Sequence, residues 1–161
     1  MLFLRHITFV HTPNRAAAVD IRSTGLVAWS LGMTGCLLRY WTFYVLGDLF
    51  TFQLAIRTNH RLITAGPYSV VRHPSYTGAI LASFGTGVYL LGPGSYIYEC
   101  GVLSTRLGIC GASIWIGWKA ILSYNLVRRV KQEDAFLKAE FEKEWSDWAN
   151  RVPYALFPGL L

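Results

Sequence analysis

Three long apolar runs dominate the pattern of hydrophobic and polar positions along the chain, at about residues 25–46, 75–91 and 107–127. Each has the roughly 17 to 25 residues that an α-helix needs to cross the hydrocarbon layer of a bilayer. The turn signal Gly92-Pro93-Gly94 ends the second run, and residues 95–106 connect it to the third. We therefore predict an all-α integral membrane protein with about three transmembrane helices, of which the second and third form a helical hairpin.

Small residues within these runs allow helices to pack closely. The first run contains Gly25, Gly32 and Gly35, and the third is rich in glycine and other small residues between positions 108 and 117. The first run also carries one charge, Arg39. This arginine either snorkels toward the membrane surface or has a functional role, and the sequence allows both interpretations.

Polar segments flank the apolar runs. Apolar positions recur near helical spacing after residue 128, so residues 128–161 predict a charged, cytosolic amphipathic helix with a short extended end. Residues 1–22 are of uncertain structure: an interfacial helix or the remnant of a longer N-terminal region, without a convincing signal-peptide cleavage site. Residues 48–59 are expected to leave the membrane along its surface. We expect residues 1–161 to form a single domain.

Composition supports the membrane interpretation. Hydrophobic residues make up 53% of the chain and charged residues 15%, whereas soluble domains carry about a quarter charged residues. The net charge is +6, but the basic residues flank the apolar runs instead of forming one stripe. This distribution indicates contact with anionic membrane lipid on the cytoplasmic side and argues against nucleic acid. The basic residues at positions 5, 15 and 22 leave the topology of the N-terminus open.

The cysteines and histidines predict neither a disulfide framework nor a metal site. Cys36 lies in an apolar run, and Cys100 and Cys110 flank a turn, where pairing is allowed but not required. The four histidines are scattered without the spacing of metal ligands.

Residues 62–78, LITAGPYSVVRHPSYTG, form the densest candidate for chemistry. Pro67 and Pro74 restrict the backbone, and His73 is pushed out of the α region by the proline that follows it. Pro74 suits the first position of the apolar helix after it. Arg72 and His73 should therefore be held rigidly at a helix N-terminus near the membrane, where the helix dipole favours anions.

A second candidate lies at residues 128–134, RRVKQED, directly after the third apolar run. Arg129 and Glu133 are one helical turn apart and can form an ion pair. An exposed pair of this kind is commonly a solvated surface contact of little energetic value. A hairpin of the second and third helices would bring it beside the turn that carries Arg72 and His73.

The two segments together resemble the signatures of the isoprenylcysteine carboxyl methyltransferase family, integral membrane enzymes that use S-adenosylmethionine. The resemblance covers about residues 25–159. It implies a cofactor pocket built from Tyr68, His73, Tyr76, Glu133 and Asp134. We assign Arg129 to the acceptor carboxylate and Glu133 to a catalytic role as hypotheses. The glycine-rich strand–turn–helix pattern of soluble methyltransferases is absent from the sequence.

The family also implies an acceptor and a location. The acceptor would be the C-terminal carboxylate of a prenylated protein or a small prenylcysteine, with its prenyl chain between the helices at 25–46 and 75–91. The endoplasmic reticulum membrane is the expected location, with the active site facing the cytosol.

Several positions depart from the family pattern. The acidic pair is Glu133-Asp134 instead of two glutamates, and Glu142 stands where relatives usually have glycine. Trp145 and Trp148 replace tyrosines, which keeps aromatic bulk and removes hydroxyl groups. Two alternatives stay open: a related methyltransferase for a phospholipid amine or another small amphiphile, which would share a similar C-terminal architecture, and a degenerate, non-catalytic membrane paralogue, which the tryptophan departures favour. In the latter case the tyrosines would be membrane-interface residues and His73 a helix cap.

Overall fold

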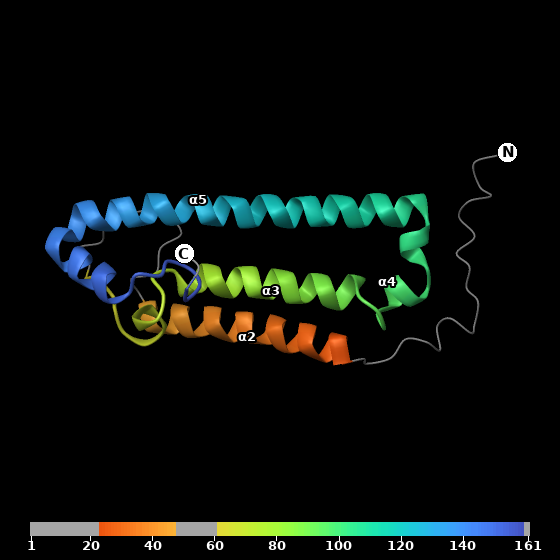
Figure 1. The fold of residues 1–161 in the computed structure, drawn as a ribbon, viewed down its shortest axis with the longest axis horizontal. Coiled ribbons are helices and arrows are strands. Elements are labelled where there is room, and N and C mark those ends of the chain that lie inside the picture. Colours follow the sequence, from red (N-terminus) through yellow and green to blue (C-terminus); the bar gives the residue numbers. More distant parts are fainter. Residues whose placement is uncertain (1–22, 48–60, 160–161) are drawn as a thin grey trace. The chain divides into compact units, whose positions relative to one another are not determined.

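The computed structural model describes residues 23–47 and 61–159. Every element within those ranges is helical: α2 (Ser23–Leu46), η2 (Gly66–Ser69), α3 (Pro74–Leu91), α4 (Tyr96–Glu99), η3 (Val102–Ser104) and α5 (Arg106–Arg151) (Figure 1). The all-α prediction is confirmed for this part of the chain, and the three apolar runs coincide with α2, α3 and the first part of α5. The interpretations of residues 1–22 and 48–59 fall outside the described residues.

The described residues divide into two compact units, residues 23–32 with 83–119 and residues 33–47 with 61–82 and 120–159. The first contains the start of α2, the end of α3, α4, η3 and the start of α5. The second contains the end of α2, the start of α3, the rest of α5 and every residue of the predicted site. A single domain, the helical hairpin and the number of membrane spans stay predictions.

In the first unit, α2 and α3 approach closely through glycine. A Cβ atom on Gly85 would lie 2.5 Å from the backbone nitrogen of Gly32 and 2.6 Å from the carbonyl oxygen of Ala28. A side chain would not fit there. Beside this contact lies an apolar groove of about 280 Å³, lined by Ser23, Thr24, Val27, Ala28, Leu31, Phe84 and Val88.

The predicted turn after α3 is present, and its local contacts explain it. Gly94 has φ 90°, a left-handed conformation that favours glycine. Its N–H donates to the carboxylate of Glu99 at 2.8 Å. The Ser95 side chain accepts from the N–H of Tyr98 and so caps α4. Cys100 and Cys110 are both free thiols.

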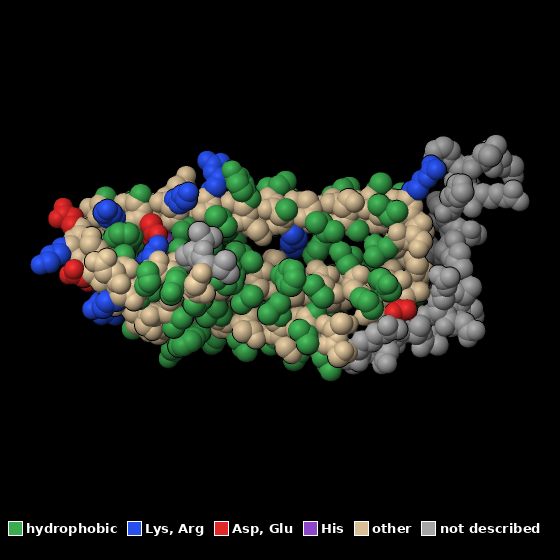
Figure 2. Space-filling model, in the orientation of Figure 1, with side chains coloured by type: hydrophobic (Ala, Val, Ile, Leu, Met, Phe, Trp, Pro, Cys, Tyr) green, Lys and Arg blue, Asp and Glu red, His purple; other side chains and the backbone are tan. Residues whose placement is uncertain are grey.

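Among the described helices, α5 is long and apolar enough to cross a membrane, and none of its apolar window is buried inside the protein. Ile109, Ile114 and Ile121 are each more than half exposed. A core helix of a soluble protein would bury such side chains. Figure 2 shows hydrophobic side chains along α5 and charged ones over its later part. The exposed apolar surface fits a membrane protein.

The end of α5 differs from the sequence prediction. Instead of a separate tail helix beginning at residue 128, α5 continues without interruption through residue 141. It breaks at Glu142, whose φ of 38° and ψ of −101° are not helical, and resumes up to Arg151. The turn at Glu142 sends the last helical segment in a new direction (Figure 1).

Candidate active site

The turn before α3 is shaped by its glycine and prolines. Gly66 has φ 62°, and Pro67 occupies the beginning of η2. Arg72 and His73 donate their backbone N–H groups to the carbonyls of Tyr154 and Ala155 at 3.0 and 2.8 Å. Residues before a proline favour such extended pairing. Pro74 then begins α3, so His73 stands at the helix N-terminus as predicted.

The C-terminal residues return to this turn after the break in α5. The indole N–H of Trp148, which is buried, donates to the carbonyl of Tyr68 at 3.1 Å. The Thr77 hydroxyl donates to the carbonyl of Leu156 at 2.5 Å. Val130, Ala155 and Leu156 form a small core. Residues far apart in the sequence therefore enclose the start of α3 together.

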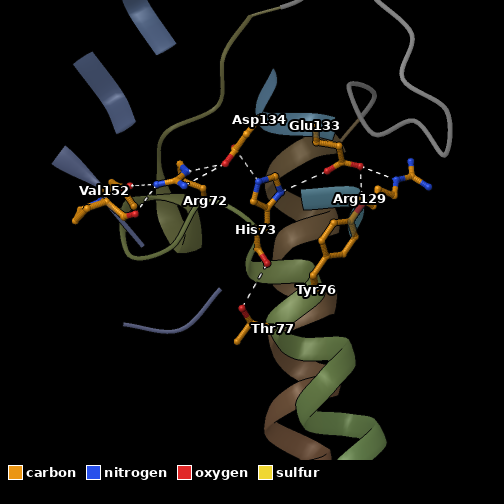
Figure 3. Close-up of polar contacts among 9 residues, drawn as sticks. Arg72, His73, Tyr76, Thr77, Arg129, Glu133, Asp134 and Val152 are labelled. Atoms are coloured by element: carbon orange, nitrogen blue, oxygen red, sulfur yellow. Dashed lines mark hydrogen bonds and ion pairs between the residues drawn. The ribbon is translucent and has the colours of Figure 1, made fainter. Parts of the chain in front are cut away.

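The imidazole of His73 lies between two consecutive carboxylates of α5 (Figure 3). Its Nε2 lies 2.9 Å from Oδ1 of Asp134, and its Nδ1 lies 3.4 Å from Oε2 of Glu133. The Tyr76 hydroxyl donates to Oε1 of Glu133 at 2.5 Å, and Nε of Arg129 donates to the same oxygen at 2.7 Å. We call these five side chains the histidine–carboxylate cluster.

The cluster is shielded from water but not sealed. The His73 side chain is 6% exposed, and those of Asp134 and Glu133 are 17% and 19% exposed. Arg129 is 40% exposed and forms the open edge. Charged hydrogen bonds in such a setting are stronger than in bulk water.

Mutual contacts set the charge of the cluster. Burial by itself would lower the pKa of His73, but the hydrogen bonds to Asp134 and Glu133 outweigh it, so the pKa is raised. Burial would raise the pKa of each carboxyl group, but its hydrogen bonds to His73 and its neighbours outweigh that effect and lower the pKa. Near neutral pH both carboxylates are ionised, and His73 holds its proton to a higher pH than an ordinary histidine.

Two aromatic rings add a flat surface. The rings of His73 and Tyr76 stack with centroids 5.7 Å apart and planes 6° apart. Burial, and then the charge of Glu133, raises the pKa of Tyr68, so its hydroxyl stays protonated.

The structure brings most of the predicted site residues into one network. His73, Tyr76, Arg129, Glu133 and Asp134 are linked by direct contacts. Tyr68 belongs to the same unit and is held there by the Trp148 contact to its carbonyl.

Two functional candidates had no role assigned from the sequence. Arg72 binds Asp134 as well as the C-terminal residues, and Thr77 holds Leu156. The sequence held a signal for Arg72, because Arg72 adjoins His73 in a rigid turn. Asp134, the acidic residue after Glu133, had no partner assigned from local helical spacing. No local signal marks Thr77.

Comparison with known proteins identifies a related family. Residues 28–106 match the family model described as "Isoprenylcysteine carboxyl methyltransferase (ICMT) family". "Protein-S-isoprenylcysteine O-methyltransferase B" of Arabidopsis thaliana is 31% identical over 121 residues, 74% of this chain and 52% of that protein. The Homo sapiens "Protein-S-isoprenylcysteine O-methyltransferase" is 33% identical over 98 residues, 60% of this chain and 28% of the relative.

Through residues 28–106 the chain belongs to the isoprenylcysteine carboxyl methyltransferase family. It spans about half the length of the Arabidopsis relative, 52%. It is also 33% identical over 104 residues, 65% of this chain and 38% of the relative, to "Cobalt-zinc-cadmium resistance protein CzcN" of Cupriavidus metallidurans. No solved structure matches the chain.

Proposed function

We propose that this protein transfers a methyl group from S-adenosylmethionine to the C-terminal carboxylate of a prenylated cysteine. The observation that carries the proposal is the position of His73 between Glu133 and Asp134, which unites the two sequence motifs in one cluster. Family membership supports the reaction class, and the relatives' printed names support the acceptor.

The donor set fits S-adenosylmethionine. Ionised Glu133 or Asp134 would accept hydrogen bonds from its ammonium group or ribose hydroxyls. Protonated His73 and the Tyr76 hydroxyl would hold its carboxylate or adenine, and the stacked rings of these two residues provide a flat surface for a base. When bound, S-adenosylmethionine supplies an electrophilic methyl group on a positively charged sulfur.

Arg129 would bind the acceptor carboxylate. It occupies the exposed edge of the cluster, and its guanidinium suits charge-assisted contact with an anion. The acceptor oxygen forms the new bond to the methyl carbon, and the electrons of the broken carbon–sulfur bond stay on sulfur. The products are a methyl ester and a neutral thioether. The acceptor is ionised near neutral pH, so the protein must position the reactants but need not remove a proton.

The apolar groove between α2 and α3 suits the hydrocarbon part of such an acceptor, because five of its seven lining residues are apolar. We infer that the prenyl chain enters from the bilayer between these helices, with α2, α3 and the first part of α5 as spans. The active site would face the cytosol, at the endoplasmic reticulum membrane.

The direct test measures binding of S-adenosylmethionine to the detergent-purified protein. We expect His73→Ala and Glu133→Ala to lose binding at least tenfold, while Arg128→Ala, on the exposed face of α5, retains it. Methyl transfer to a farnesylcysteine analogue would then be assayed, with Arg129→Ala expected to raise the KM for that acceptor. A folded wild type that binds no cofactor contradicts the proposal and favours the non-catalytic paralogue.

The same assay distinguishes an amine acceptor. A phospholipid amine must lose a proton before it attacks, so its methylation rate would rise steeply with pH. The rate with a carboxylate acceptor should be nearly flat from about pH 6 to 8, because the acceptor is already ionised.

A further inference from the structure

The Arg72 side chain donates four hydrogen bonds beside the site. Its Nε and Nη2 donate to Oδ2 of Asp134 at 3.3 and 3.1 Å. Its Nη1 donates to the carbonyls of Val152 and Pro153 at 2.9 and 2.6 Å. The guanidinium thus joins α5 to the C-terminal residues, and its side chain is only 14% exposed (Figure 3).

The two oxygens of Asp134 have different partners. Oδ2 binds Arg72, which leaves Oδ1 directed at Nε2 of His73 at 2.9 Å. A carboxylate held at one oxygen by a rigid fork has little rotational freedom at the other. The orientation of the His73 ring therefore depends on the contact between Arg72 and Asp134.

The C-terminal residues 152–156 are fastened to the same turn. The backbone N–H groups of Arg72 and His73 bind the carbonyls of Tyr154 and Ala155, and Thr77 binds Leu156. The Arg72 guanidinium binds both this segment, at Val152 and Pro153, and the carboxylate of Asp134. Thr77 fastens the segment without touching either carboxylate.

We propose that Arg72 is the positioning residue of this site: its guanidinium orients the Asp134 carboxylate toward His73 and binds the segment of residues 152–156 to the turn before α3. The inference rests on the proposed function for its effect on cofactor binding. A lysine cannot replace it, because one ammonium group cannot span the carboxylate and two carbonyls in the same planar geometry.

The charges around Asp134 determine how the stability of the protein should change with pH. Arg72 and His73 contact its carboxylate, Glu133 and Arg129 belong to the same cluster, and Lys138 lies one helical turn further along α5. Contacts to His73 and Arg72 lower the pKa of Asp134. Stability from this group is lost as pH falls through the folded pKa. Removing Arg72 raises that pKa, so stability should be lost at a higher pH.

The experiment compares Arg72→Gln with Thr77→Val and with Arg128→Gln, an exposed arginine of α5 outside the cluster. Three quantities are measured on the full-length, detergent-purified protein. The first is the acid limb, meaning the fall of Tm with decreasing pH, measured without cofactor. The second is the rate of tryptic cleavage after Arg151, and the third is the Kd for S-adenosylmethionine. Arg72→Lys is included in case the glutamine variant does not fold.

For Arg72→Gln we expect an acid limb moved to higher pH, faster release of the segment after Arg151, and a Kd raised at least tenfold. Thr77→Val should speed cleavage without moving the acid limb, and Arg128→Gln should change none of the three. Arg72→Lys should speed cleavage and weaken binding while the acid limb stays near wild type, since the charge is kept.

Two results would overturn the inference. Behaviour of Arg72→Gln equal to that of Arg128→Gln removes any role for Arg72. Faster cleavage with an unmoved acid limb, as for Thr77→Val, reduces Arg72 to a fastener of the C-terminal segment. Absence of cofactor binding in the wild type contradicts the proposed function alone, because cleavage and the acid limb still decide the role of Arg72.

Discussion

At the residue scale, His73, Glu133 and Asp134 are each bound by more than one partner, so removing one of these side chains breaks several contacts. Glu133 accepts from Tyr76 and Arg129 through one oxygen and faces His73 through the other. A neutral hydrogen bond contributes about 1 kcal/mol, and one to a charged group contributes about 1.5–3 kcal/mol. Loss of any one hydrogen bond of Glu133 should therefore have a measurable energetic effect.

Tyr76→Phe tests the hydroxyl that reaches Glu133. The change removes one charge-assisted hydrogen bond and leaves the ring and its stacking on His73. We expect S-adenosylmethionine affinity to fall about tenfold, which corresponds to ~1.4 kcal/mol. Binding is measured by calorimetry in detergent. Tyr96→Phe, on the exposed side of α4, is the matched control; an equal response in both variants would contradict a role for the Tyr76 hydroxyl.

Glu142 is the one described non-glycine residue with positive φ, 38°. Side chains in this region are strained by about 1–3 kcal/mol, and glycine is not. Glu142→Gly should therefore increase the free energy of unfolding by about 1 kcal/mol and raise Tm accordingly. Glu140→Gly, placed inside the regular part of α5, should lower stability by about the same amount. Thermal unfolding of both variants checks the pair, and a fall in both would show that Glu142 is not strained.

At the scale of elements, the close approach of α2 and α3 depends on the absence of side chains at a few positions. A Cβ on Gly35 would lie 2.5 Å from the backbone nitrogen of Ala82 and from the carbonyl oxygen of Gly78. A Cβ on Gly78 would meet Arg39 in turn. Arg39 also donates to the carbonyl of Ser75 at 3.0 Å. The charge in the first apolar run thus has a structural partner at the start of α3.

Gly35→Ala tests this close approach of α2 and α3. The added methyl group has no space, so the helices must move apart, at a cost of about 1–3 kcal/mol. Gly111→Ala is the control, because nothing lies within 4 Å of the Cβ that it would add. Tm in detergent should fall for Gly35→Ala and stay level or rise slightly for Gly111→Ala. Equal tolerance of both substitutions would show that the helices do not touch at Gly35.

At the scale of the whole molecule, the cluster makes stability depend on pH from both sides. The lowered pKa values of Glu133 and Asp134 stabilise the fold above about pH 4, where the unfolded carboxyl groups are ionised. The raised pKa of His73 stabilises it fully below about pH 6.5, and this part is lost as pH rises through the folded pKa. The full contribution of the cluster is therefore present between about pH 4 and 6.5.

His73→Gln should abolish the alkaline loss. In the wild type we expect Tm to decline as pH rises above about 6.5, and in the variant to be lower at pH 6 and flat above it. Tm measured from pH 5 to 9 checks this, with a variant of an exposed residue, Arg128→Gln, following the wild type. A wild-type Tm that rises through this range would show that His73 is neutral in the fold.

The membrane interpretation also belongs to this scale. The apolar window of α5 is unburied, and large apolar side chains on α2 and α3, among them Trp29, Leu37 and Phe84, are more than half exposed. Surfaces of this kind are stable in hydrocarbon and unstable in water.

Much of the fold could be predicted from the chain alone. Hydropathy and turn residues act over short distances, so the apolar runs, the proline start of α3 and the turn at Gly94 were all visible in the sequence. The site was visible in part. Arg129 and Glu133 pair within one helical turn, a local relation. The resemblance of both motifs to one family supplied the rest of the candidate residues.

The sequence by itself determined which segments are helical and where a rigid, polar turn precedes α3, because those properties depend on neighbours in the chain. Only the tertiary structure decided the partners of His73, the four hydrogen bonds of Arg72 and the break at Glu142. His73 and Asp134 are 61 residues apart in the chain. Contacts over such separations form only when packing compensates the entropy of closing the loop, and no local pattern records that balance.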